Sequence, residues 1–525
     1  MKKETNRWVA LFAMSLGVFM GLLDVTVVNV ALPSMAIDFK TTFSNLQWIL
    51  NAYTLMFAVS LLIVSKLGDM FGRKKIFILS MILFTIASVV NGLAPNLLVL
   101  DIGRAVQAIG GSGMMSLSMA LVASNFSGRE RGTALGILGS VIGFSTAIGP
   151  LVGGLLVENF GWPSIFFVNL PVGIIAVYLV FRNVKETPAY GAEESIDFMG
   201  MILSAIGLFA GIYGLIQKEQ HMHWAWTDMR IMGWLVSSII ILAIFVFVEL
   251  KVKSPMMNLK LLTNRHFVGV VILAFALGAG IFALAAYQTS LMQNYMGYSA
   301  FTTGLRQLPM SLWSLVLGPF TGVLGYKFGK KWMIAFGFII AGVGLFTFSR
   351  VSTTDFTYLQ LLPLLVLTGL GNAIINPMIN TAAMDNINPK EIGMASGLLN
   401  VFRQIGITVG VVVLGLAQTK AYEASLNTGF SDSHMPNAAA TGIHQALVNA
   451  GAFSGHMVAW SQKMISTPYA DKVQNIVLTA FNKGMIQVVL TSLIMMIIGV
   501  LGAIFLLRET KSVDQKLDGN VRKKD

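Results

Sequence analysis

The sequence predicts an all-α integral membrane protein with fourteen transmembrane helices, built as two six-helix halves with two helices inserted between them. The first observation is the composition, because 55% of the 525 residues are hydrophobic and only 11% are charged, whereas soluble proteins carry about 25% charged residues. The second is a set of fourteen apolar stretches long enough to cross a bilayer. The third is a repeated sequence pattern that relates the two halves.

The apolar stretches follow one another along the chain with short polar connections. Each has roughly the 20 residues that a helix needs to cross the hydrocarbon core of a membrane. They lie at 8–33, 45–67, 76–93, 97–124, 133–157, 163–183, 196–217, 230–250, 267–292, 302–326, 332–350, 356–384, 394–417 and 485–507. We predict an N-terminal six-helix bundle at 8–183, two inserted linker helices at 196–250, and a C-terminal six-helix bundle at 267–507.

The positions of Lys and Arg predict the orientation of these spans. Basic residues are concentrated in the tails and in the connections on the same side as the tails, and cytoplasmic connections are the ones enriched in Lys and Arg. We therefore expect a multi-pass protein of the bacterial cytoplasmic membrane with both termini in the cytoplasm, including a tail at 508–525. The longest connection, 418–484, is then extracellular, and its weakly amphipathic runs predict a short helical hairpin.

A pattern that follows the second span returns after the tenth. The stretch 65–74 reads SKLGDMFGRK, and the stretch 322–331 reads GVLGYKFGKK. Leu, Gly, Phe and Gly coincide, and both copies end in basic residues. Two related halves that face each other across a central cavity are typical of a transporter that works by rocking.

Asp24 is a lone carboxylate within the first apolar stretch. Nine residues separate it from the end of that stretch, which is about 14 Å at the helical rise. A charge at this depth costs roughly 3 kcal/mol or more, so it indicates a function such as holding a proton or a cationic substrate. The alternative is a carboxylate satisfied by neighbouring hydroxyl groups. Arg104 in the fourth span lies about 10 Å deep from the same side, so the two can form a salt bridge, with or without a role in transport.

Several other classes of function are excluded. A net charge of +12 would favour nucleic-acid binding only if the basic residues formed one continuous basic surface, and the sequence indicates no such surface. The basic residues instead suit contact with anionic membrane lipids. The chain has no cysteine, so disulfides and thiolate metal sites are excluded. The histidines of the 418–484 connection are too widely spaced to predict a metal site. Because no phosphate-binding loop or nucleophile–base pair is recognisable, we expect neither an enzyme nor a cofactor.

Five short patterns follow one another between residues 8 and 417. Leu23–Pro33 matches L-D-x-T-x-x-N-x-A-L-P at every fixed position, and Lys66–Lys75 is similar to G-x-L-x-D-R-x-G-R-K, with Ser65 for its Gly and Met70 for its Arg. The others are RAVQAIGG from Arg104, similar to R-x-x-Q-G with the glycines displaced, a glycine-rich stretch ending GPLVGG at Gly154, and DFMG from Asp197. Together they resemble the major facilitator superfamily, and within it the fourteen-span drug:proton antiporters, the QacA- and EmrB-like multidrug exporters.

The resemblance implies a major facilitator fold driven by the proton gradient, without a cofactor. In the family, the arginine that matches Arg104 is implicated in proton coupling, so Asp24 and Arg104 are the expected coupling pair. The charged residues of the connection after the second span can form a network with the start of a neighbouring helix and so act as a latch; the alternative is a turn with solvated charges. The kinked, glycine-rich fifth span can form a tightly packed contact that controls switching; the alternative is ordinary helix packing. The expected switch residues are Asp69, Arg73, Gly149, Pro150, Gly153 and Gly154.

The expected function is export of lipophilic, cationic drugs or toxic compounds by a monomer, through alternating access and in exchange for protons. Aromatic rings attract cations, and the 30 methionines give an adaptable apolar surface. The expected substrate cavity is lined by Asp24, Trp48, Tyr53, Phe57, Arg306 and Arg403. An anionic substrate that binds to Arg306 or Arg403 is a further alternative. The alternatives are a dedicated metabolite or lipid exporter of the same fold, and a non-transporting receptor or scaffold that uses the long outer loop.

Overall fold

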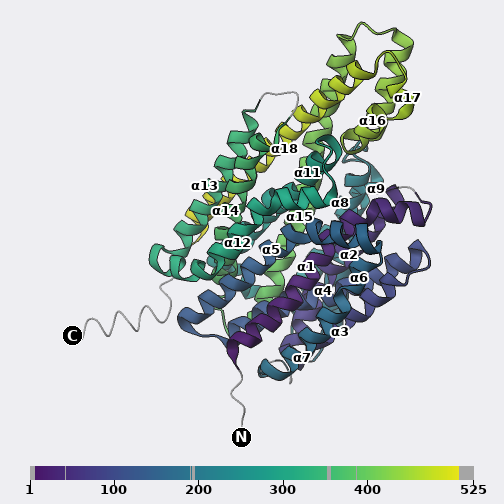
Figure 1. Ribbon diagram of the computed structural model, residues 1–525. Coiled ribbons are helices and arrows are strands. Elements are labelled where there is room, and N and C mark those ends of the chain that lie inside the picture. Colours follow the sequence, from purple (N-terminus) through teal and green to yellow (C-terminus); the bar gives the residue numbers. More distant parts are fainter. Residues whose placement is uncertain are drawn as a thin grey trace.

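The computed structural model describes residues 6–41, 43–189, 191, 195–351, 356–385 and 387–507. Within these ranges the secondary structure is helical (Figure 1). In the described part of the chain, thirteen helices are long and apolar enough to cross a membrane, and the bent helix α5, counted as one span, brings the number to fourteen. The predicted all-α membrane fold is therefore confirmed. The predicted tail at 508–525 lies outside the described residues.

The first half consists of five long helices and a sixth span made of two pieces. Side-chain caps mark where α1 and α4 begin; for example, Asn96 accepts a hydrogen bond from the backbone N–H of Val99 at 3.0 Å, which satisfies a donor that the first turn leaves free. The helices are α1 (Arg7–Asp38), α2 (Phe43–Phe71), α3 (Arg73–Gly92), α4 (Leu97–Asn125), α5 (Gly128–Phe160), α6 (Ser164–Phe167) and α7 (Asn169–Asn183).

Helix α5 is the bent member of this half. Its segments Glu130–Thr146 and Ile148–Phe160 meet at 45°. Pro150 lies just beyond the bend, and proline bends a helix because it has no N–H to donate to the preceding turn. The kink predicted for the fifth span is therefore present.

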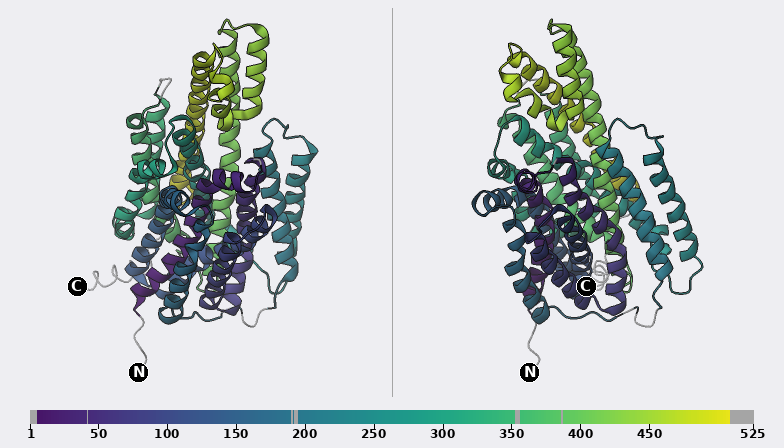
Figure 2. Two further views of the ribbon diagram at one scale, coloured as in Figure 1. Left: turned by 45° about the vertical axis from the view of Figure 1, so that its right-hand side comes forward. Right: turned by 90° about the vertical axis from the view of Figure 1, so that its right-hand side faces the viewer.

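Two helices, α8 (Phe198–Gln220) and α9 (Met229–Glu249), are inserted between the halves. They form a hairpin at the side of the bundle (Figure 2). Helix α8 packs against α2 and α15, whereas α9 packs mainly on α8 and exposes large side chains such as Ile239 and Phe247. This exposed apolar surface suits contact with lipid.

The second half repeats the succession of long helices, with a first span that contains two π-helical turns. Its elements are η1 (Leu259–Thr263), α10 (Arg265–Leu277), η2 (Gly278–Phe282), α11 (Ala283–Ser290), η3 (Leu291–Tyr295), α12 (Ala300–Phe328), α13 (Lys330–Ser349), α14 (Tyr358–Ala383), α15 (Ile392–Ser431), α16 (Asn437–Ala459), α17 (Gln462–Ile465) and α18 (Ala470–Leu506).

Helices α15 and α18 are much longer than the spans expected at 394–417 and 485–507. They have 40 and 37 residues, or about 55–60 Å at the helical rise, against a hydrocarbon core of about 30 Å. The segment 418–484, expected as a connection with a short hairpin, therefore holds the end of α15, all of α16 and α17, and the beginning of α18. These elements project beyond the bundle at the upper end in Figure 1, opposite the lower end where α1 begins.

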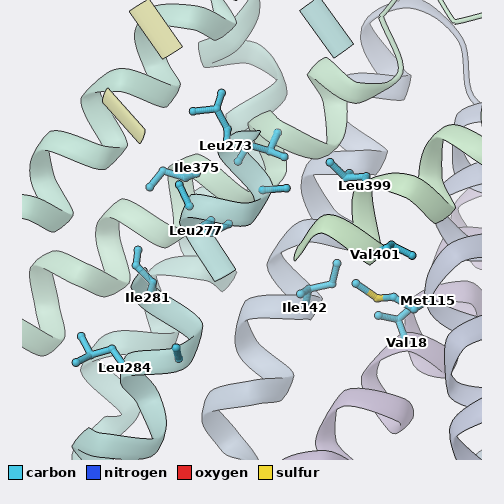
Figure 3. Packing of buried hydrophobic residues seen from close by; sticks show 14 of the residues in the cluster. Val18, Met115, Ile142, Leu273, Leu277, Ile281, Leu284, Ile375, Leu399 and Val401 are labelled. Carbon is cyan, nitrogen blue, oxygen red and sulfur yellow. The ribbon is translucent and has the colours of Figure 1, made fainter. Parts of the chain in front are cut away.

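The halves meet chiefly where α5 packs along α12 and where α2 packs along α15. Hydrophobic side chains of the two halves also meet between these seams. Figure 3 shows Val18, Met115 and Ile142 of the first half grouped with Val401 of the second, and all four are buried within one hydrophobic cluster.

Candidate functional site

Asp24 and Arg104 form an ion pair inside the first half. Asp24 lies on α1 and Arg104 on α4, and the Nη1 atom of Arg104 donates to Oδ2 of Asp24. Both side chains are fully buried. The contact that their depths allow is therefore present, and its role in proton coupling stays a prediction.

Neutral amides surround the other oxygen of this carboxylate. Gln107 Nε2 and Asn169 Nδ2 donate to Asp24 Oδ1 at 2.9 and 3.0 Å. The same amides donate to the hydroxyl of Ser88 at 2.7 and 3.2 Å. Gln107 is the glutamine of the R-x-x-Q-G pattern in the fourth span, so a sequence pattern could have identified it as part of the site. No pattern pointed to Asn169 or Ser88.

Aromatic rings and a backbone carbonyl enclose the arginine. Its Cζ lies 4.3 Å from the ring centroid of Tyr53 and 5.8 Å from that of Phe166, and its Nε donates to the carbonyl of Ile49 at 3.4 Å. Its Nη2 has no hydrogen-bond partner among the described residues. The arginine thus has a donor free to form a new bond when its pairing with the carboxylate changes.

The other residues expected in the substrate cavity have separate surroundings. The ring of Trp48 lies 6.1 Å from that of Tyr213 on inserted helix α8, and Phe57 stacks on Tyr53 at 5.8 Å. Arg306 lies near the start of α12, with its Cζ 3.8 Å from the ring centroid of Tyr298. Phe57 is thus linked to the Asp24–Arg104 pair through Tyr53, whereas Trp48 and Arg306 pack against other aromatic rings. The part of all three residues in substrate binding stays a prediction.

Arg403 is buried in the second half and has no carboxylate partner among the residues that the structure describes. Its Nη atoms donate to the side-chain oxygens of Asn400 at 3.1 Å and Asn380 at 2.7 Å. Its Nε, the Nδ2 of Asn380 and both polar atoms of Asn376 have no partner among the described residues. Because buried polar groups are costly when unpaired, this cluster is suited to hydrogen-bond a polar group of a ligand or water.

Asp69 and Arg73 connect the two halves at the lower end. Asp69 Oδ1 accepts from Nε of Arg73 at 2.7 Å, and its Oδ2 accepts from the backbone N–H of Met394, at the start of α15, at 3.1 Å. Arg73 Nη2 donates to the carbonyl of Pro389 at 2.9 Å. Met394 and Pro389 belong to the second half, so this network ties α2 and α3 to it. The latch geometry is present, and its role in switching stays a prediction.

The glycines of α5 allow close contact with helices of both halves. A Cβ atom at Gly149 would lie 2.5 Å from Cβ of Thr26 on α1, and one at Gly154 would lie 2.9 Å from the backbone N of Phe301 on α12. Gly153 packs against Val27 of α1 in the same way. Helix α5 therefore joins the helix that carries Asp24 to the other half.

The family model described as Major Facilitator Superfamily matches residues 14–411 of this chain. The chain belongs to the major facilitator superfamily. It is accordingly a multi-pass membrane transporter rather than an enzyme.

Relatives of this superfamily member support the same assignment. It is 32% identical over 410 residues to Multidrug resistance protein Stp of Mycobacterium tuberculosis, covering 78% of this chain and 75% of the relative. It is 29% identical over 433 residues to the Tetracenomycin C resistance and export protein of Streptomyces glaucescens, covering 82% and 79%. The crystal structure of the human organic anion transporter MFSD10 has a TM-score of 0.59 at 12% identity, covering 94% of this chain and 99% of that one; this likeness concerns the fold. The predicted resemblance to multidrug exporters is confirmed.

Proposed function

We propose that this protein exports lipophilic, cationic compounds from the cytoplasm in exchange for protons, with the lower end of the molecule and both termini facing the cytoplasm. The buried Asp24–Arg104 pair carries the proposal. Both oxygens of Asp24 are engaged by neighbouring side chains, so a proton is the one substrate small enough to reach this carboxylate while its surroundings stay packed.

A proton on Asp24 removes the charge that pairs with Arg104. The arginine is then buried without a counter-charge, and its surroundings must rearrange to solvate it. Thr26 and Val27 follow Asp24 within the next turn of α1 and contact Gly149 and Gly153 of α5. A shift of α1 is therefore transmitted to α5 and, through the contact of Gly154 with Phe301, to the second half.

The lipophilic substrate class rests on the relatives and on the apolar centre. One relative is named for multidrug resistance and the other for resistance to and export of tetracenomycin C. The second name favours a dedicated exporter of one class of compound as the alternative. The amides around Arg403 supply polar contacts for either kind of substrate once the halves open.

Transport by purified protein in liposomes with an imposed pH gradient tests the proposal, with ethidium as the lipophilic cation. We expect Asp24→Asn to abolish uphill movement, because a neutral amide cannot exchange a proton. Asp38→Asn is the matched control on the same helix, since Asn keeps an oxygen that accepts from Nε1 of Trp162, as Asp38 does at 2.7 Å. Gradient-driven transport by Asp24→Asn at the wild-type rate would exclude the coupling role. Failure of the wild type to move this cation would favour the dedicated exporter.

A further inference from the structure

Two buried carboxyl groups lie at the lower ends of the inserted helices, away from the Asp24 site. Asp197 precedes α8 and Glu249 ends α9, and they are 7% and 4% exposed. One oxygen of each accepts a backbone N–H: Asp197 Oδ1 from Gly200 at 2.8 Å, and Glu249 Oε2 from Met257 at 2.9 Å. The other two oxygens, Asp197 Oδ2 and Glu249 Oε1, have no hydrogen-bond partner among the described residues.

These two oxygens converge on one point of the backbone. A Cβ atom at Gly200 would meet Glu249 Oε1 first and Asp197 Oδ2 next, the latter at 2.6 Å, so the absence of a side chain at Gly200 leaves the space in which both carboxyl groups meet. Two ionised carboxylates in contact and out of water repel each other strongly. A single proton removes the repulsion and supplies the missing bond, because a protonated carboxyl donates to its ionised neighbour.

We propose that Asp197 and Glu249 form a proton-binding site that holds one proton between them and controls the closed state of the lower end. Glu249 fixes Met257, and the connection 250–258 reaches both halves. Its Pro255 carbonyl accepts from Nζ of Lys66 on α2 at 3.0 Å, and the Asn258 side chain donates to Glu391 at the start of α15. This is the same start of α15 that the Asp69 latch holds.

The charged groups on the elements around this pair are few. Lys66 on α2 is directed to Pro255, and Glu391 beside α15 is bonded to Asn258. On the continuation of α9, Lys251 and Lys253 are exposed, and the Nζ of Lys251 lies 4.0 Å from the ring centroid of Phe247. Lys66, Glu391 and Lys251 each have a contact of their own and Lys253 faces solvent, so the shared proton is the group whose loss changes the pair.

Loss of the proton leaves two buried negative charges in contact. They separate, Glu249 releases Met257, and the connection 250–258 no longer braces α2 against α15. The closed lower end is therefore stabilised at low pH on that side and loosened at high pH. This regulation acts through groups distinct from Asp24 and does not require the proposed export.

Infrared spectroscopy of the detergent-solubilised full-length protein tests the proton itself. Between about pH 5 and about pH 9, where a coupled buried carboxyl pair releases its last proton, the wild type should lose one protonated-carboxyl band that Glu249→Gln and Asp197→Asn both lack. Both amides keep the pair bonded without a titrating proton. Asp228→Asn at the other end of the hairpin is the control, because hydrogen bonds from Arg230 lower the pKa of Asp228 to about 2 and it titrates outside this range. An identical spectrum in wild type and Glu249→Gln would overturn the proposal.

A single reactive thiol tests the control of the lower end. The chain has no cysteine, and Ser396 is buried between α15 and α4, where its hydroxyl donates to the carbonyl of Ser116 at 2.7 Å. In Ser396→Cys, maleimide labelling should rise several-fold more with pH than in Ser396→Cys combined with Glu249→Gln, in which only ionisation of the thiol contributes. Adding Asp228→Asn instead should leave the rise unchanged. Equal pH dependence with and without Glu249→Gln would show that the pair does not control this end.

Discussion

The two copies of the repeated pattern make different contacts, although each lies where one long helix ends and the next begins. In the first copy, Asp69 and Arg73 reach Met394 and Pro389 in the other half. In the second, Tyr326 replaces the acid and is 46% exposed. The basic residue that matches Arg73 is Lys330, and it pairs at 2.6 Å with Asp385 of its own half. The first copy therefore bridges the halves, whereas the second stabilises one of them.

The buried arginines differ in the same direction. Arg104 of the first half is paired with a carboxylate, while Arg403 of the second half is bonded only to amide oxygens among the described residues. A charge pair responds to a proton, whereas an arginine among amides keeps its charge and its contacts. The two halves therefore repeat a succession of long helices, whereas the buried arginine of the first half has a carboxylate partner and that of the second half has amide partners.

Replacing each buried arginine by alanine should give the largest difference between the halves in lost unfolding free energy. Arg104→Ala leaves an uncompensated buried carboxylate, which costs about 3–5 kcal/mol of unfolding free energy. Arg403→Ala leaves two neutral amide oxygens unpaired, at a cost of about 1–3 kcal/mol. Unfolding in detergent, monitored by circular dichroism, measures both values. Equal losses would show that the pair in the first half has no special electrostatic role.

A second measurement separates stability from proton coupling in these variants. Arg104→Ala removes the positive charge that contacts Asp24. We expect Arg104→Ala to release fewer protons than wild type when substrate is added to solubilised protein, titrated over pH. Arg403→Ala should release the wild-type number. An unchanged titration midpoint in Arg104→Ala would mean that Asp24 and Arg104 do not communicate.

The sequence predicted the framework of the first-half site better than its detail. Apolar length located the spans, and the rise per residue placed Asp24 and Arg104 at depths at which they meet. The amide contact of Asn169 was not predictable, because Asn at the start of an apolar span has no pattern that shows which helix it faces. The lengths of α15 and α18 were missed for a related reason, since hydropathy marks where a helix leaves lipid and not where it ends.

Disruption of the latch should have a smaller effect that is again confined to the first copy. Asp69→Asn removes the charge that holds Arg73 and weakens the bond to Met394, which costs about 2–3 kcal/mol for charge-assisted hydrogen bonds. Tyr326→Phe changes an exposed hydroxyl and should stay within about 0.5 kcal/mol. Labelling of Ser396→Cys should increase several-fold with Asp69→Asn and stay constant with Tyr326→Phe. If both copies give the same labelling, the latch does not distinguish the halves.

Adding one methyl group at a tightly packed glycine of each half should give the smallest difference in stability and the sharpest test of transmission. A Cβ at Gly149 on α5 would press on Thr26, and one at Gly410 on α15 would press on the backbone of Ala279. Overpacking by a methyl group costs about 1–3 kcal/mol in either place, so Gly149→Ala and Gly410→Ala should unfold at similar denaturant concentrations. Gly233→Ala on α9 is the control, because nothing lies within 4 Å of its added Cβ.

Transport should nevertheless separate the two glycines. Thr26 is two residues from Asp24 on α1, so a methyl group at Gly149 alters the contact through which a shift of α1 reaches α5. The contact at Gly410 joins two elements of the second half, neither of which carries the proton-sensitive pair. We therefore expect Gly149→Ala to lower the rate of proton-driven ethidium export several-fold, while Gly410→Ala retains a rate close to that of Gly233→Ala. Equal reduction by Gly149→Ala and Gly410→Ala would assign the loss to packing alone, and transmission would then have to run through the Asp69 latch instead of the α5 seam.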